Sequence, residues 1–166
     1  MPTKDNLQSA FAGESQANRK YLAFAKKAET EGFSQVARLF RAVAEAETIH
    51  AHAHLKAMDG VQSTTDNLKA AIDGEKYEFT EMYPAFIKEA EAEGEKRAVR
   101  SMTHANEVEK IHHDLFTKAL EAVESGKDLS DQAVYVCPVC GHTEMGTPPD
   151  NCPICNVKGE RFDTIS

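Results

Sequence analysis

The chain has 166 residues, of which 41% are hydrophobic and 28% are charged, and its formal net charge is −8. This length accommodates one ordinary globular domain and a small module, and the acidic balance argues against nucleic acid as a partner. No apolar run is long enough for a membrane span. Residues 1–5 lack the apolar core of a secretion signal, so we expect a cytoplasmic protein without a membrane partner.

Residues 3–60 predict two helices joined by a tight turn. Thr3 or Asp5 can cap the first helix, which should end at Gly32 because glycine is a common C-terminal stop. Ser34 can cap the second helix, which should run to about residue 60. Apolar residues recur at helical spacing in both segments, so each helix should bury one face.

Two more helices are predicted between residues 66 and 126. Asp66 can cap the third helix, Gly94 should end it, and Pro84 within it predicts a kink. After the fourth helix the helical period stops, and residues 135–136 and 160–162 resemble short strands. The predicted organisation is a helical domain at 1–126, a linker at 127–133 and a cysteine-containing module at 134–166.

The second and fourth predicted helices each carry a Glu-x-x-His motif, Glu47–His50 and Glu109–His112. Residues three apart lie on one face of a helix, and here that face is the apolar stripe. An unpaired carboxylate in a protein core costs several kcal/mol. The pattern therefore predicts a metal ion that neutralises these carboxylates.

The two motifs belong to an internal repeat. Glu14 recurs 61 places later as Glu75, while the motif glutamate and histidine recur 62 places later. Carboxylate helices that alternate with Glu-x-x-His helices are typical of a dinuclear metal site in a four-helix bundle. Helix three has Glu78 where the repeat has Ala17, so one metal position has a spare ligand. The predicted ligands are Glu14, Glu47, His50, Glu75, Glu78, Glu109 and His112.

A simpler interpretation is a solvated charged face with core histidines, but two aligned copies of the motif argue against it. Tyr21 and Tyr83 lie on or near the same face. They either pack in the core or donate hydrogen bonds to ligand carboxylates. Carboxylate oxygen and imidazole together suit iron or manganese.

All four cysteines fall in two Cys-Pro-x-Cys pairs, Cys137–Cys140 and Cys152–Cys155. Two such pairs separated by a loop predict a tetrahedral four-thiolate metal site. Zinc would make this module a structural ribbon, and iron would make it a one-electron carrier. The neighbouring two-metal site favours iron, which zinc can replace on purification.

The link between the second and third helices has about six residues and spans at most about 20 Å. The second predicted helix is about 37 Å long. If two-fold symmetry relates the two helix pairs, the third helix must begin near the opposite end of the bundle from the point where the second helix stops. Because the link cannot cross that distance, we expect a domain-swapped homodimer, possibly within a higher oligomer. A monomer with alternating up and down helices is the alternative.

Together the two modules resemble rubrerythrin, a ferritin-like di-iron domain followed by a rubredoxin-like domain. The resemblance covers nearly the whole chain, in this order. It rests on the two Glu-x-x-His motifs, the two Cys-Pro-x-Cys pairs and three short segments at residues 12–17, 74–78 and 81–84. The implied fold class is mainly α, a ferritin-like four-helix bundle followed by a small rubredoxin-like β module.

The resemblance also implies a function. The family reduces hydrogen peroxide to water, and electrons pass from a rubredoxin or an NAD(P)H-dependent reductase through the four-cysteine iron. Glu47 and Glu109 would bridge the two irons of the bundle. Glu14 would hold one iron with Glu78 or His50 as an exchangeable ligand, and Glu75 and His112 would hold the other. The linker would place the cysteine module of one chain near the di-iron site of another.

Two other functions are compatible with these residues. One is an iron-handling protein or ferroxidase whose zinc ribbon contacts a partner. The other is a helical scaffold without catalysis. Metal content separates them, because about three irons per chain indicates the peroxidase, and two irons with one zinc indicates the ferroxidase.

Overall fold

The computed structural model describes residues 2–165. The chain forms two compact units, Met1–Gln62 and Ser63–Ser166, and each is described by itself. No helix in the described range is long and apolar enough to cross a membrane.

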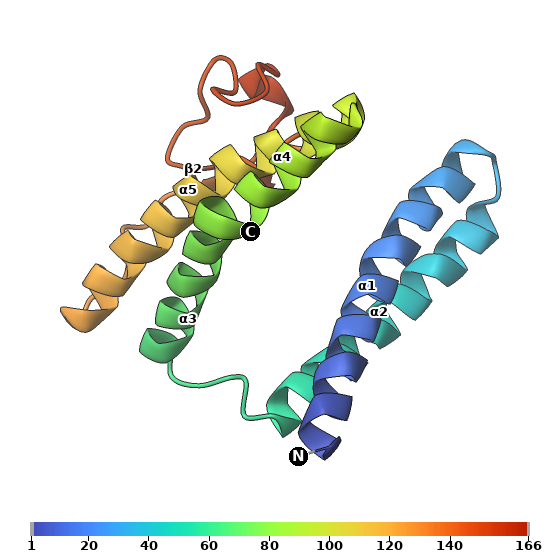
Figure 1. Cartoon of the computed structure of the whole chain (residues 1–166), viewed down its shortest axis with the longest axis horizontal. Coiled ribbons are helices and arrows are strands. Elements are labelled where there is room, and N and C mark those ends of the chain that lie inside the picture. Colours follow the sequence, from blue (N-terminus) through green and yellow to red (C-terminus); the bar gives the residue numbers. More distant parts are fainter. Residues whose placement is uncertain (1, 166) are drawn as a thin grey trace. The chain divides into compact units, whose positions relative to one another are not determined.

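The first unit is a hairpin of two long helices, α1 (Pro2–Thr30) and α2 (Ser34–Ala57), which lie side by side (Figure 1). Gly32 turns the chain with φ of +85°, a conformation that glycine adopts without strain. The contact between the helices is made of small side chains, which let the two backbones approach closely. The buried alanines are Ala25, Ala28, Ala37, Ala44 and Ala51.

Asn18 is the buried polar residue of this hairpin, with 6% of its surface exposed. Its side-chain amide donates hydrogen bonds to the Ala44 carbonyl at 2.7 Å and to the Thr48 hydroxyl at 2.8 Å. These bonds join α1 to α2 one turn from each of the predicted ligands Glu14 and Glu47, and so fix the register of the helix pair.

The predicted caps of the first three helices are all wrong by a few residues. Thr3 and Asp5 lie inside α1, which already includes Pro2. Phe33, without a side-chain cap, precedes α2, and Ser34 is the first helical residue. The third helix begins at Thr64, after Ser63, whose hydroxyl accepts a hydrogen bond from the Asp66 N–H. The Ser63 hydroxyl also donates a hydrogen bond to the Asp66 carboxylate at 2.6 Å. Serine is therefore the cap, and aspartate is its partner in a capping box.

The third helix has three parts: α3 (Thr64–Tyr77), a π-helical turn η1 (Glu78–Met82) and α4 (Tyr83–Glu93). It packs against the fourth long helix, α5 (Lys96–Glu124). The irregularity therefore lies ahead of Pro84, where the sequence predicts a kink. Pro84 sits in the first turn of α4, where its missing N–H costs little. Gly94 ends the helix with φ of +75°, as predicted.

The π-helical turn accounts for the change in repeat spacing. The spacing is 61 residues at Glu14 and Glu75, but 62 residues at Tyr21 and Tyr83 and in the Glu-x-x-His motifs. One residue has therefore been added between Glu75 and Tyr83. The Tyr83 N–H bonds the carbonyl of Glu78, five residues back, so the wider turn absorbs the addition. Tyr83 consequently keeps the same angular position relative to Glu75 that Tyr21 has relative to Glu14.

The cysteine module has three short strands: β1 (Val134–Val136), β2 (Thr143–Met145) and β3 (Asp163–Ile165). They form an antiparallel sheet in the order β2-β1-β3. The predicted strand at 160–162 is wrong, because a 3₁₀ turn η2 occupies Gly159–Arg161 and the strand follows it. Cys137, Cys152 and Phe162 form the buried core.

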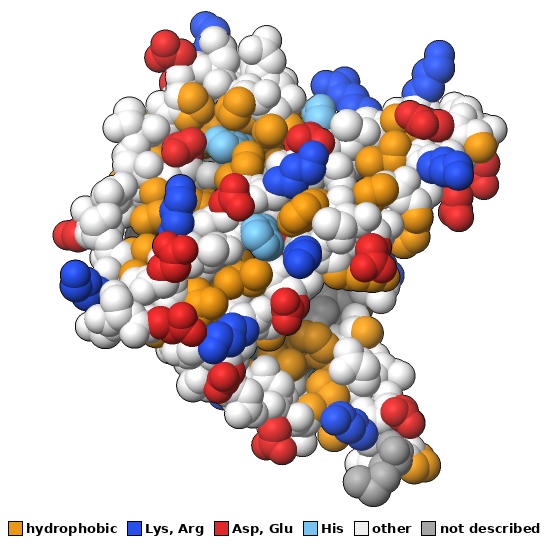
Figure 2. All heavy atoms as spheres, turned by 60° about the vertical axis from the view of Figure 1, so that its left-hand side comes forward, with side chains coloured by type: hydrophobic (Ala, Val, Ile, Leu, Met, Phe, Trp, Pro, Cys, Tyr) orange, Lys and Arg blue, Asp and Glu red, His pale blue; other side chains and the backbone are white. Residues whose placement is uncertain are grey.

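The predicted fold class is confirmed: the chain is mainly helical, with four long helices and a small sheet that carries the cysteines. The domain swap and the domain boundaries remain predictions. Both units leave apolar side chains in contact with solvent, and Figure 2 shows such side chains at the surface between charged ones. They include Phe24, Val36, Leu39 and Ile49 in the first unit and Tyr77 and Phe86 in the second.

Candidate metal centres

The first unit brings Glu14, Glu47 and His50 together. One ligand atom from each residue lies within 4.8 Å of the other two. Glu47 is largely shielded, with 15% of its side chain exposed, and its Oε2 lies 2.9 Å from the His50 Nδ1. The His50 side chain is 56% exposed, so this group opens toward the surface of the hairpin.

The second unit brings the repeat-equivalent residues together, Glu75, Glu109 and His112. The His112 Nδ1 lies 2.8 Å from the Glu109 Oε2 and 3.8 Å from the Glu75 Oε2. These side chains are 26%, 13% and 20% exposed, in the order His112, Glu109, Glu75. The second group is therefore more enclosed than the first, mainly because its histidine is covered.

The electrostatics of the second group favour a cation. Burial, and then the charge of Glu109, raise the pKa of Glu75 above its ordinary value. Burial, and then the charge of Glu75, raise the pKa of Glu78. Both shifts mean that negative charge is crowded in a partly desolvated place. A bound cation would remove that cost, so the donor set fits a metal.

Glu78 and Tyr83 interact with the second group without belonging to it, and Tyr21 packs against aromatic rings of the first unit. Glu78, at the first position of the π-helical turn, is outside the three-residue group but near enough to interact with Glu75. Burial raises the pKa of Tyr83, with further contributions from Glu109 and Glu78. Tyr21 packs against Phe24 and Phe40, with ring centroids 6.3 and 6.1 Å apart.

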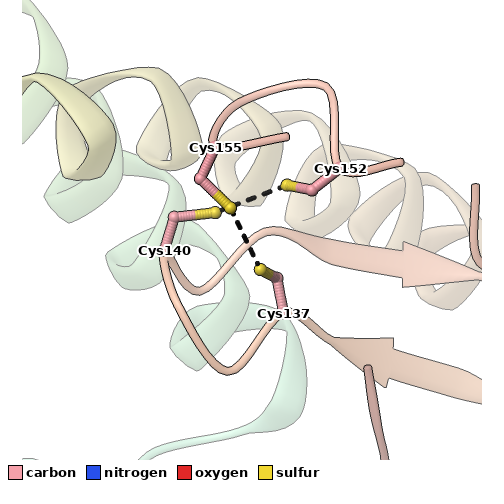
Figure 3. Close-up of side chains that lie close together, drawn as sticks. All are labelled: Cys137, Cys140, Cys152 and Cys155. Atoms are coloured by element: carbon pink, nitrogen blue, oxygen red, sulfur yellow. Dashed lines mark hydrogen bonds between the residues drawn. The ribbon is translucent and has the colours of Figure 1, made fainter. Parts of the chain in front are cut away.

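The four cysteines point toward one centre from two loops (Figure 3). Cys137 and Cys155 have sulfurs 3.5 Å apart, as do Cys140 and Cys152. Four sulfurs about 2.3 Å from a central metal lie about 3.8 Å from one another, so the observed spacing suits a tetrahedral ion. Gly141 and Asn156 follow the two Cys-Pro-x-Cys pairs in the left-handed conformation, which glycine and asparagine tolerate better than other residues.

Backbone N–H groups point at the sulfurs of this site. Burial tends to raise the pKa of Cys137, but N–H groups of Cys140 and Val139 outweigh it and leave that pKa lowered. Burial raises the pKa of Cys140 and of Cys155, which share the centre with their neighbours. Four thiolates this close repel one another, so the N–H donors and a metal ion must together hold them.

The cysteine module packs against α5, the helix that carries Glu109 and His112. The His112 Nε2 lies 3.1 Å from the Thr143 hydroxyl and 3.3 Å from the Gly141 carbonyl. The module therefore contacts the metal group of its own chain, whereas the sequence predicts that the linker carries it to another chain. The sequence has no local signal for this contact, because its partners are 29 and 31 residues apart.

The comparisons with known proteins agree with this arrangement. The family model "Rubrerythrin" matches residues 5–120, and the model "Rubrerythrin, rubredoxin-like domain" matches residues 135–163. The chain belongs to the rubrerythrin family. Rubrerythrin-2 of Clostridium acetobutylicum is 38% identical over 98% of this chain and 96% of its own length. Nigerythrin of Nitratidesulfovibrio vulgaris is 38% identical over 92% of this chain and 81% of its own.

A solved structure of nigerythrin in a partially reduced state covers 98% of this chain and 86% of that chain. Its TM-score is 0.60 at 35% sequence identity. As in rubrerythrin and nigerythrin, the chain has carboxylate and histidine candidates for a di-iron site and a rubredoxin-like four-cysteine site. Family membership thus indicates an oxidoreductase that has two kinds of metal centre, the carboxylate–histidine site and the four-cysteine site.

Proposed function

We propose that this rubrerythrin-family protein reduces hydrogen peroxide to water. The observation that carries the proposal is the packing of the four-thiolate module against α5, beside Glu109 and His112. A site that accepts electrons one at a time needs an electron source close by, and this module supplies one. We further propose iron at all three positions. A solved structure of nigerythrin in its fully reduced, all-ferrous state supports this assignment.

The reaction takes up two electrons and two protons for each peroxide and yields two water molecules. Iron bound by the carboxylates and histidines would supply these electrons and stabilise the departing hydroxide. The electrons would come, one at a time through the cysteine module, from a rubredoxin or an NAD(P)H-dependent reductase. The chain itself contributes binding, orientation and protons.

Individual side chains have distinct tasks in this proposal. Glu47 and Glu109, with 15% and 13% of their side chains exposed, would bridge the two metal positions. Glu14 and Glu75 would each bind one metal, and Glu78 would exchange with His50 as the further ligand.

Tyr83 provides a proton at the site. A phenol with the ordinary pKa of about 10 is already protonated at neutral pH, and burial raises the pKa of Tyr83 further. Its hydroxyl can therefore donate a hydrogen bond to bound peroxide or to a carboxylate. Tyr21 occupies the equivalent place in the repeat, and we propose the same role for its hydroxyl.

We also propose that a second copy of the chain completes the site. Each unit holds one group of three ligands, and each unit leaves an apolar helix face exposed. Only residues 58–63 connect α2 to α3, a span of at most about 20 Å. The hairpin of one chain would therefore cover α3, α4 and α5 of another, in a domain-swapped dimer.

The function is tested by separating electron delivery from peroxide cleavage. Cys137→Ser should abolish turnover driven by an NAD(P)H-dependent reductase, because the four-thiolate iron is lost. The same variant, reduced chemically and freed of excess reductant, should still consume about one peroxide per di-iron site. Val139→Ser, an exposed change in the same loop, is the matched control and should behave as wild type. Normal reductase-driven turnover by Cys137→Ser would overturn the proposal.

A further inference from the structure

The two ring nitrogens of His112 face different parts of the molecule. Nδ1 lies 2.8 Å from the Glu109 Oε2 and 3.8 Å from the Glu75 Oε2. Nε2 lies 3.1 Å from the Thr143 Oγ1 and 3.3 Å from the Gly141 carbonyl oxygen. One nitrogen therefore faces the carboxylates, and the other faces the cysteine module.

The surroundings of Nε2 decide which nitrogen carries the proton. The Gly141 carbonyl can only accept a hydrogen bond. The Thr143 hydroxyl lies 3.2 Å from that carbonyl and donates its hydrogen there, which leaves its lone pairs free. Nε2 therefore donates. Nδ1 faces the Glu109 and Glu75 carboxylates, which can only accept, so its lone pair is free to bind a cation that lies between them. Histidines that bind metals usually donate the other ring N–H to a fixed acceptor in this way.

His50, the repeat equivalent, lacks this support within its own hairpin. Its Nδ1 lies 2.9 Å from Glu47, but the described residues of that hairpin give its Nε2 no hydrogen-bond partner. Its side chain is 56% exposed, against 26% for His112. The cysteine module thus orients one histidine of the pair and leaves the other free to turn.

We propose that Thr143, together with the Gly141 carbonyl, is a positioning residue that fixes the tautomer and ring orientation of His112 for metal binding. The cysteine module is then a structural part of the second metal group as well as an electron source. The link between the two centres is one hydrogen bond, from His112 to the residue that follows Cys140. The role of this hydrogen bond in electron transfer rests on the proposed peroxide reduction. Passage of an electron along it breaks no bond and moves no proton.

The test compares Thr143→Val, which removes the hydroxyl, with Thr143→Ser, which keeps it. Valine suits strand β2, so the sheet should form in both variants. The probe is Co²⁺, titrated into the full chain with zinc already in the cysteine site. Thr143→Val should bind one Co²⁺ about tenfold more weakly than wild type, because loss of such a partner costs about 10- to 100-fold in metal affinity. Thr143→Ser should stay within about twofold of wild type.

A second readout reports the histidine directly. In the Co²⁺-loaded protein the imidazole N–H gives a shifted proton NMR signal, which should exchange with water faster in Thr143→Val than in wild type. Zinc content shows whether the module has folded. If Thr143→Val matches wild type in both Co²⁺ affinity and N–H exchange, the positioning role is wrong.

The iron-loaded protein separates this inference from the proposed function. Peroxide added to the reduced wild type should reoxidise the thiolate-bound iron, seen as visible absorption, and Thr143→Val should do so several-fold more slowly. If wild type fails to respond to peroxide while Thr143→Val still weakens Co²⁺ binding, peroxide reduction is wrong and the positioning role stands.

Discussion

Val36 tests whether a second chain covers the open face of the first hairpin. It is 46% exposed and lines an open groove of about 260 Å³ with Tyr21, Leu39, Phe40 and Val43. Val36→Ala deletes two carbon groups worth about 0.8 kcal/mol each on full burial. About half of that burial remains to be gained at the interface, so each copy should lose about 0.8 kcal/mol. A dimer contains two copies, and the loss of about 1.6 kcal/mol should raise its dissociation constant about 15-fold.

Val36→Glu should separate the chains more completely, because it places a carboxylate in the covered face at a cost of several kcal/mol per copy. Sedimentation velocity over a concentration series measures both effects. Arg38→Glu changes the charge by more but lies about 160° around the helix, so it should leave the dimer intact. If both Val36 variants sediment as wild type does, or if wild type is a monomer, the swapped dimer is refuted.

Three further predictions concern stability. Burial and the charge of Glu109 raise the pKa of Glu75 in the folded protein above its ordinary value of 4.5. In the metal-free protein, the stability that Glu75 contributes is therefore complete below pH 4.5. It is lost as the pH rises through the raised pKa. Glu75→Gln should reduce that loss, which urea unfolding at several pH values measures; identical pH profiles would contradict it. Asn18→Leu should lower the free energy of unfolding by about 1–3 kcal/mol, because it removes both side-chain hydrogen bonds between α1 and α2. Thr48→Val removes one of these bonds and should lower the free energy of unfolding by less. An unchanged urea midpoint for Asn18→Leu would contradict this prediction. Metal removal from the cysteine site should speed amide exchange at Cys137 and Cys152, whose N–H groups bond across the loops at 2.8 and 2.7 Å, and continued protection after chelation would show that the sheet holds itself together.

The sequence predicts the helices, and the convergence of the candidate ligand side chains, because both depend on local spacing. Glu47–His50 and Glu109–His112 lie three apart on helices, so their convergence follows from helix geometry alone. Glu14 and Glu75 then join them by the repeat. The four cysteines converge for a similar reason, since each pair closes within one short loop.

Features that depend on distant contacts were not predictable. His142 is 4% exposed, packs against Phe162 and lies 3.2 Å from Glu144, and no local sequence pattern indicates its burial. The loop after Cys140 carries it into the module. Strand β2 was missed because three residues are too few to show alternation. The contact of Thr143 with His112 depends on how the module docks, which no local pattern records.

The added residue in the third helix has a consequence for how the two halves of the chain can diverge. A strict duplication would make the two metal positions chemical twins, with the same donors at the same reach. The π-helical turn confines the extra residue to Glu78–Met82, so that the tyrosine and the Glu-x-x-His motif downstream remain in phase with their counterparts in the first half. The difference in backbone between the two halves is thereby limited to one turn, which begins at Glu78. The two halves of a pseudo-symmetric protein can therefore differ at Ala17 and Glu78 while their tyrosines and Glu-x-x-His motifs stay in register.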